Sequence, residues 1–390
     1  MYPHQAERLT QTLERHGLEA LIATTAANVA YVTGFSSLAK EVYRTASFAV
    51  FTRGGTALCV PAIDLAPIVV DAVAVDQVVA FGGFVSGYAE APDTAAQRIR
   101  ALAAARAATP ADALAAALEA VGVSAGTVAL DEGHITPQAW QRVVARLSGY
   151  TVVPAFDHFL AARRIKGPWE LECLQRALTI VEEAANAVVQ MLRPGVTEQE
   201  AVRFFQQATL QRGGMPYGAI VAFGERAAIP APSPSDRALR SRDLVRLDFG
   251  CVHRGYCAEV ARIAVMGEPG PRASRAADAI LTGLEAAIGR IAPGVTAGDI
   301  HETAVGATRE AGLPGFTRYH VGHGIGLEPY ERPKLNAGNS TPLEAGDVLR
   351  VETPYYEHGW GGLSIKDTVL VTTTGARALN RSARGLVVLD

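Results

Sequence analysis

Two acidic residues, Asp248 and Glu259, lie inside the apolar segments of the run LDFGCVHRGYCAEVAR. Burying a carboxylate is costly unless a cation or a hydrogen-bond donor compensates it. The run reads as a β-hairpin, and a turn centred between His253 and Arg254 would place the two acids directly opposite each other. Because opposed like charges are destabilising, this register predicts a cation or a shared proton between them.

A second pair of candidate residues lies near the C-terminus, in the strand-like segments DVLRVETPYY and LSIKDTVLVT. A hairpin centred near Gly359 would oppose Glu352 and Lys366, whose charges are complementary. The adjacent glycines Gly361 and Gly362 could shift this register by one residue and turn Lys366 outward. The hairpin therefore predicts an acid and an ammonium near the first two acids.

Between the two hairpins, the segment RYHVGHGIGLEPYERPKLN contains two histidines among several glycines. Glycines let backbone or substrate approach closely. A lone histidine is more often structural than functional, but a histidine beside two acid-bearing hairpins is a good candidate for proton transfer. We expect His323 to be catalytic and His320, Tyr330 and Arg332 to contact a substrate.

The elements that carry these residues divide the chain into two parts. Residues 1–156 alternate between helical and strand-like patterns, which is typical of an α/β layer domain. Residues 157–390 combine long amphipathic helices with glycine-punctuated strands, which favours an α+β domain with helices on one side of an antiparallel sheet. The pattern L/I-x-PGVT occurs at 192–197 and again at 291–296, which indicates an internal helix–turn–helix duplication.

Composition limits the function classes. The 390 residues are 49% hydrophobic and 19% charged with a net charge of -3, as in a globular enzyme and unlike a disordered chain or a basic nucleic-acid-binding protein. The four cysteines lack zinc-type spacing and are expected to be reduced thiols. The charged amphipathic start is unlike a signal peptide, and the most apolar region, 65–84, contains Asp71 and Asp76. We therefore expect a cytoplasmic protein without nucleic-acid or membrane partners.

Four ordered motifs resemble the creatinase/aminopeptidase P/prolidase superfamily, the pita-bread fold of peptidase family M24. These are SRDLVRLDFGCVHRGYCAEVARIAVMGEP, HVGHGIGLEPYERP, AGDVLRVETPYY and GGLSIKDTVLVT, and NVAYVTGF and LAARRIKGPWELECLQRA extend the resemblance toward the N-terminus. The resemblance implies an α+β pita-bread catalytic domain at 157–390, preceded by an α/β creatinase-type domain at 1–156. It also implies a homodimer acting on a small-molecule substrate.

Metallopeptidases of that superfamily hold two divalent ions with two Asp, one His and two Glu. Asp248, His323 and Glu352 match three of these ligands, whereas Glu259 replaces an Asp and Lys366 replaces the metal-bridging Glu. Three carboxylates and one ammonium leave about two negative charges, and an ammonium in the bridging position repels a metal pair. The chain therefore resembles a member with a degenerate metal site. No metal is favoured; the alternative is one ion such as Mn, Zn or Fe on Glu259, His323 and Glu352.

The expected function is hydrolysis of a small non-peptide or atypical amide, amidine or guanidine C–N bond without metal, as in creatinase or ectoine hydrolase. Asp248 and Glu259 would bind a cationic nitrogen, one of them acting as nucleophile or base, while His323 moves the proton. Lys366 would pair with an acid or bind a substrate carboxylate. The histidine on which creatinase relies is Ala231 here, so creatinase's own mechanism does not carry over.

Two alternatives remain open at this point. One is a divergent Xaa-Pro dipeptidase or aminopeptidase with at most one metal ion. The other is a catalytically inactive pita-bread protein that binds a peptide or small molecule.

Overall fold

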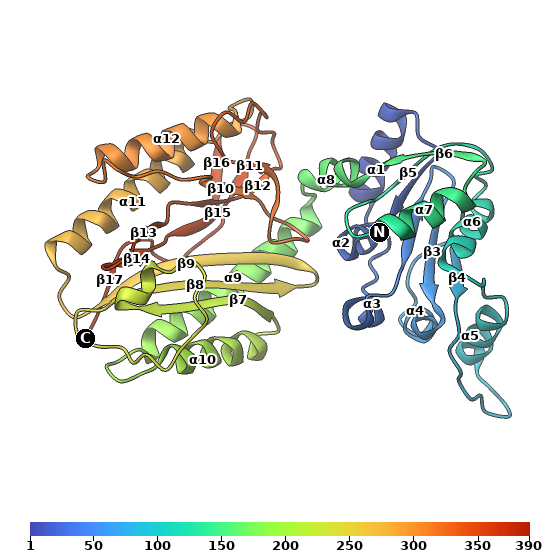
Figure 1. Ribbon diagram of the computed structural model, residues 1–390, viewed down its shortest axis with the longest axis horizontal. Helices are drawn as coiled ribbons and strands as arrows, with labels where there is room; N and C mark the ends of the chain where they lie inside the picture. Colours follow the sequence, from blue (N-terminus) through green and yellow to red (C-terminus); the bar gives the residue numbers. More distant parts are fainter. The chain divides into compact units, whose positions relative to one another are not determined.

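The computed structural model describes all 390 residues, which form two compact units, Met1–Arg163 and Arg164–Asp390 (Figure 1). The division falls within helix α8 (Phe156–Arg164), whereas the change in sequence character lies after residue 156. Each unit has its own sheet and its own hydrophobic core.

The N-terminal unit is an α/β layer domain built on a six-stranded sheet of order β4-β3-β2-β1-β5-β6. Strands β1–β2 and β2–β3 pair antiparallel, and the other neighbours are parallel. Its elements before α8 are α1 (Pro3–His16), β1 (Ala20–Ala23), α2 (Ala26–Thr33), α3 (Leu38–Tyr43), β2 (Phe48–Phe51), β3 (Thr56–Pro61), η1 (Ala62–Asp64), α4 (Leu65–Val70), β4 (Gln77–Phe81), α5 (Thr94–Ala104), α6 (Pro110–Ala120), β5 (Gly126–Leu130), α7 (Pro137–Arg146) and β6 (Tyr150–Pro154).

Local sequence signals set several of these boundaries. Helix α1 ends at Gly17, whose φ of 61° is a left-handed conformation that glycine adopts without steric cost. Helix α7 begins at Pro137, and the Thr136 side chain accepts a hydrogen bond from the backbone N–H of Ala139. The β2–β3 hairpin pairs Phe51 with Thr56 and turns at Arg53 and Gly54.

The C-terminal unit is built on a curled sheet of nine strands, as the resemblance to the pita-bread fold implies. The main order is β11-β10-β12-β15-β9-β8-β7, with β16 on β15 and β17 on β9. Its elements are α9 (Pro168–Met191), α10 (Glu198–Gln211), β7 (Met215–Phe223), η2 (Gly224–Ala228), β8 (Leu244–His253), β9 (Tyr256–Met266), α11 (Pro271–Arg290), α12 (Ala297–Glu310), β10 (Gly322–Gly324), β11 (Glu331–Lys334), β12 (Val348–Glu352), β13 (Tyr355–Glu357), β14 (Gly361–Leu363), β15 (Lys366–Val371), β16 (Ala376–Ala378) and β17 (Val387–Leu389).

Two similar helix pairs cover this sheet, as the repeated PGVT pattern predicts (Figure 1). Helices α9 and α11 end at Leu192 and Ile291 with matching extended backbones, ψ 129° and 118°. Thr197 and Thr296 then begin α10 and α12 through the same reciprocal capping box. The first pair shares one core with β8 and β9, and the second shares another with β12 and β15.

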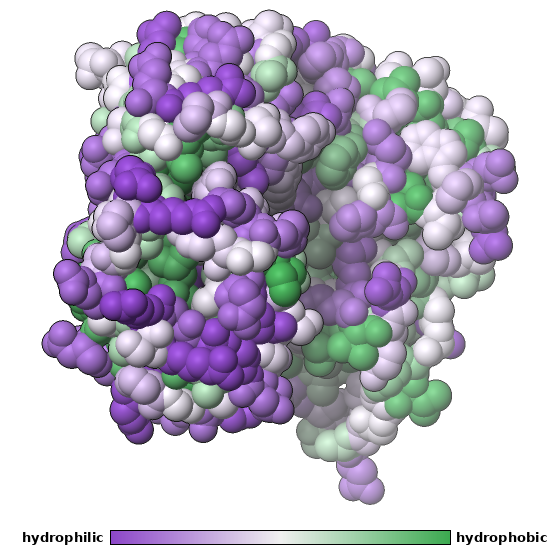
Figure 2. Space-filling view, turned by 60° about the vertical axis from the view of Figure 1, so that its left-hand side comes forward, coloured by the Kyte–Doolittle hydropathy of each residue, from purple (hydrophilic) through white to green (hydrophobic).

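The outside of the C-terminal unit is mainly hydrophilic on the face that Figure 2 shows, with small hydrophobic patches between polar side chains. This is the usual surface of a globular domain whose large apolar residues are in its core. None of the helices combines the length and apolar character needed to cross a bilayer.

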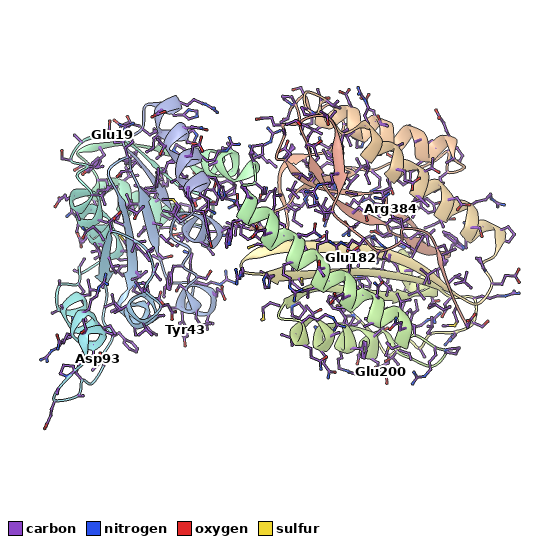
Figure 3. All side chains as sticks on the ribbon, turned by 180° about the vertical axis from the view of Figure 1, so that it is seen from behind. Glu19, Tyr43, Asp93, Glu182, Glu200 and Arg384 are labelled. Carbon is purple, nitrogen blue, oxygen red and sulfur yellow. The ribbon has the colours of Figure 1, made fainter.

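The segment between β16 and β17 connects helix α9 with strand β15. The Glu182 carboxylate on α9 accepts hydrogen bonds from the backbone N–H groups of Arg381 and Ser382, at 3.0 and 2.9 Å (Figure 3). Arg384 then donates to Asp367 at 2.5 Å. Asp367 is the neighbour of the candidate residue Lys366, and successive strand residues point to opposite faces. This contact therefore fixes the strand that carries Lys366.

Candidate active site

The predicted direct opposition of Asp248 and Glu259 is wrong by two residues. Strand β9 places Ala261, not Glu259, opposite Asp248. The two turn residues are Arg254 and Gly255, with φ of 51° and 83°, because a two-residue hairpin turn of this type needs positive φ at both positions. A shift of two residues preserves the side-chain alternation, so both acids still face the same side of the sheet.

The predicted opposition of Glu352 and Lys366 is confirmed. The outer strands β13 and β14 keep the same register through Gly361, which pairs with Glu357. Lys366 is also opposite Ala261 on its other side. Asp248, Ala261, Lys366 and Glu352 therefore form one row across four neighbouring strands.

The Lys366 ammonium lies among all three predicted acids. Its Nζ atom is 2.7 Å from an oxygen of Asp248, 3.4 Å from Glu259 and 3.5 Å from Glu352. All four side chains are buried. The sequence suggests two roles for Lys366, and the structure shows the first of them, pairing with the acids. The side chain is not turned outward.

Arg350 is a second cation of this cluster that the sequence analysis missed. It donates a hydrogen bond to Glu259, and its Nη2 atom is 3.2 Å from Glu352. The signal was present, because Arg350 is two residues before Glu352 in a strand and therefore lies on the same face. Three carboxylates and two cations leave a net charge of -1, so the predicted value of -2 is corrected.

The two cations keep Glu352 ionised. Burial alone would raise the pKa of this carboxyl, but Arg350 and then Lys366 act against burial and lower its pKa to about 2. At neutral pH the cluster is therefore a set of ion pairs, and Glu352 carries no proton to donate.

His323 is fully buried in β10 and is held in one tautomer. Its Nδ1 atom is 2.8 Å from the Gly324 carbonyl oxygen, which can only accept a hydrogen bond, so Nδ1 carries the proton. The Nε2 atom then has a lone pair, and it is buried without a hydrogen-bond partner. Burial lowers the pKa of His323 to about 4, so the ring is neutral and able to accept a proton at pH 7.

The structure brings two of the three predicted substrate-contacting residues to His323. The Tyr330 ring is stacked on His323 at 3.8 Å, and the His320 ring lies 5.7 Å from His323. His320 Nδ1 is also 3.5 Å from Glu352. Arg332, by contrast, is exposed on β11 and lies outside the buried cluster.

Tyr217 is a further residue at the site that the sequence analysis did not single out. Its hydroxyl is 3.3 Å from Glu259 on the adjoining part of the sheet. Burial raises its pKa, so the hydroxyl keeps its proton and donates a hydrogen bond to the carboxylate. Nothing in the sequence pattern marks this tyrosine, because β7 carries an irregularity in its register between Tyr217 and Ile220.

Comparisons with known proteins agree with this architecture. The model of metallopeptidase family M24 matches residues 172–373, and that of the creatinase/prolidase N-terminal domain matches residues 5–165. The chain belongs to family M24. An uncharacterized peptidase of Staphylococcus saprophyticus is 26% identical over 375 residues, covering 96% of this chain and 98% of that protein. A second uncharacterized peptidase, from Staphylococcus aureus, is 31% identical over 255 residues, covering 64% and 72%.

Solved structures share the fold of this M24 protein over its whole length. The X-Pro aminopeptidase of Thermotoga maritima has a TM-score of 0.80 at 24% identity, with 99% of this chain and 100% of that chain covered. The Xaa-Pro dipeptidase of Bacillus anthracis has a TM-score of 0.83 at 22% identity, with 99% of both chains covered. At these identities the likeness concerns the fold.

The residues of this M24 protein do not fit the metal pair that the family implies. The resemblance to the superfamily assigns a bridging carboxylate to the position of Lys366, and the ammonium of Lys366 lies within 3.5 Å of all three remaining acids. Arg350 also engages Glu259 and Glu352. His323 Nε2 has a free lone pair that could bind a metal ion, but a single imidazole does not make a metal site.

Proposed function

We propose that this protein hydrolyses the amide C–N bond of a short peptide or a related small amide without a metal ion. The carrying observation is the position of Lys366, whose ammonium contacts three carboxylates in the part of the fold that the superfamily uses for metal ions. Membership of M24 supports cleavage of a C–N bond. The names of the relatives, which are peptidases and Xaa-Pro hydrolases, favour a peptide over the non-peptide amides expected from the sequence.

In this proposal the chain's own residues perform the proton transfers. Water attacks the carbonyl carbon while its proton moves to His323 Nε2, the unpaired acceptor. The same proton then passes to the leaving nitrogen as the C–N bond breaks, so His323 ends unchanged. Lys366 and Arg350 stabilise the negative charge that develops on the carbonyl oxygen. The residual charge of -1 suits one cationic amine on the substrate.

A binding protein without activity is the second candidate. The observation that favours it is that each of the three carboxylates already has a cation within the protein. Acids that are satisfied in this way have less to gain from a cationic ligand. Assembly as a homodimer and a cytoplasmic location remain predictions from the sequence.

A substrate panel after exhaustive chelation tests the proposal. The panel comprises Xaa-Pro dipeptides, other dipeptides, and non-peptide amides, amidines and guanidines. We expect turnover of one class that persists in the chelator, and a decrease of about 100-fold or more in kcat for His323→Gln. His253→Gln, which changes a histidine beside the β8–β9 turn, is the matched control and should retain activity.

Two results would contradict the proposal. Turnover that appears only when a divalent ion is added would assign the chain to the one-metal peptidases. Saturable binding of a panel compound with no turnover in any class would instead support the binding protein.

A further inference from the structure

A cavity of about 1030 Å³ in the N-terminal unit is formed by residues that take no part in the candidate active site. It lies at the C-terminal ends of the parallel strands β1 and β5, because Thr24 follows β1 directly and Ile135 lies between β5 and α7. In α/β sheets, ligands bind at this edge. The volume corresponds to that of a small-molecule site.

Two hydroxyl groups in the cavity wall lack hydrogen-bond partners. Ser47 is 1% exposed, and its Oγ atom is buried with no partner within the protein. The Oγ1 atom of Thr45, two residues earlier in the chain, is also buried without a hydrogen-bond partner. A buried hydroxyl without a partner is costly, and native proteins rarely leave one in this state. Because both residues line the cavity, a polar group of a bound ligand would supply the missing hydrogen-bond partners.

The lining of the cavity carries more positive than negative side chains. Lys40 lines the cavity and has no carboxylate within ion-pair distance. Asp131 acts on Lys40 from a distance, but its own oxygens accept hydrogen bonds from four groups of the protein. Arg142 lines the cavity as well, and Glu41 is the acid of the lining. Burial lowers the pKa of Lys40, which means that burial disfavours the charged ammonium. An anion bound beside it would stabilise the charged form.

Two helix N-termini and several apolar side chains complete the lining. Thr109 and Thr136, the N-caps of α6 and α7, both border the cavity, and helix N-termini carry partial positive charge. Phe48, Ile135 and Val143 supply apolar wall. The ligand that fits has an anionic end and an apolar body.

We propose that this cavity binds a small organic anion, a carboxylate or a phosphate ester with an apolar group. Lys40, Ser47 and Thr45 bind the anionic end, and Phe48 and Val143 contact the body. This inference does not depend on the proposed hydrolase function.

Calorimetric titration of the full-length protein tests the cavity. The probes are 3-phenylpropionate, phenyl phosphate and, as the neutral analogue, 3-phenylpropan-1-ol. We expect one anion to bind at one site per chain, and the alcohol to bind about tenfold more weakly or not at all. The anion that binds more tightly shows whether the natural ligand is a carboxylate or a phosphate ester.

Variants connect the binding to the named residues. Lys40→Met should weaken the anion about tenfold or more, and Ser47→Ala about fivefold. Arg15→Gln removes one positive charge from the same unit outside the cavity and should leave the Kd unchanged. His323→Gln should also leave it unchanged, which separates this site from the hydrolase proposal. If Ser47→Ala does not fold, Lys40→Met alone decides the matter.

Three results would overturn the inference. These are no saturable binding of either anion below about 1 mM, equal affinity for the neutral alcohol, and an unchanged Kd in Lys40→Met.

Discussion

Replacing Lys366 with Met is expected to lower the free energy of unfolding by about 3–5 kcal/mol at pH 7. The buried ammonium contacts Asp248, Glu259 and Glu352. Its removal leaves Asp248 without its lysine partner, and Arg350 as the cation of Glu259 and Glu352. Met keeps most of the apolar length of the lysine side chain, so most of the loss comes from the missing charge. Urea denaturation of the variant and the native protein measures the difference.

The effect of Lys366→Met should depend on pH in a defined direction. The pKa of Glu352 is lowered to about 2 in the folded protein, below its ordinary value of 4.5. A depressed carboxyl pKa contributes stability that is present above pH 4.5 and disappears as pH falls toward 2. Lys366 provides part of that contribution, so the destabilisation should be largest at neutral pH and smaller near pH 3.

Lys334→Met is the matched control, because it removes the same group from a half-buried position on β11, where the ammonium lies over the Tyr319 ring. We expect a loss of about 1 kcal/mol or less. Equal losses in the two variants, or a Lys366→Met protein as stable as the native one, would mean that the ammonium is not a required partner of the acids.

Replacing Arg350 with Met is expected to destabilise the protein by roughly 3 kcal/mol, because it leaves Glu259 with only the more distant Lys366 and Tyr217. Neutralising the acid as well, in Arg350→Met/Glu259→Gln, should recover about half of this loss. Arg377→Met on the exposed strand β16 serves as control and should change stability by less than about 0.5 kcal/mol. A double variant no more stable than Arg350→Met would show that the two side chains are not energetically coupled.

Several elements could be predicted because their signals are local. Thr136 and Pro137 begin α7, Gly17 ends α1, and Thr197 with Glu200 forms the capping box of α10. The symmetry of the hairpin about Gly359 likewise sufficed for its register.

The register of the β8–β9 hairpin could not be predicted correctly, because it depends on which two residues adopt positive φ in the turn. Arg254 does so although it is not glycine. Strand alternation could have identified Arg350, because it shares a face with Glu352. The N-terminal cavity had no sequence signal, since segments from four parts of the chain meet there only after folding.

The central claim is that an internal ammonium stands where the M24 metallopeptidases use metal ions. Calorimetric titration of Mn²⁺ and Zn²⁺ into chelator-treated native protein, with Glu352→Gln in parallel, tests it most directly. We predict no stoichiometric binding that depends on Glu352, because Lys366 and Arg350 already engage this carboxylate. One or two ions per chain bound by the native protein and lost in Glu352→Gln would contradict the account.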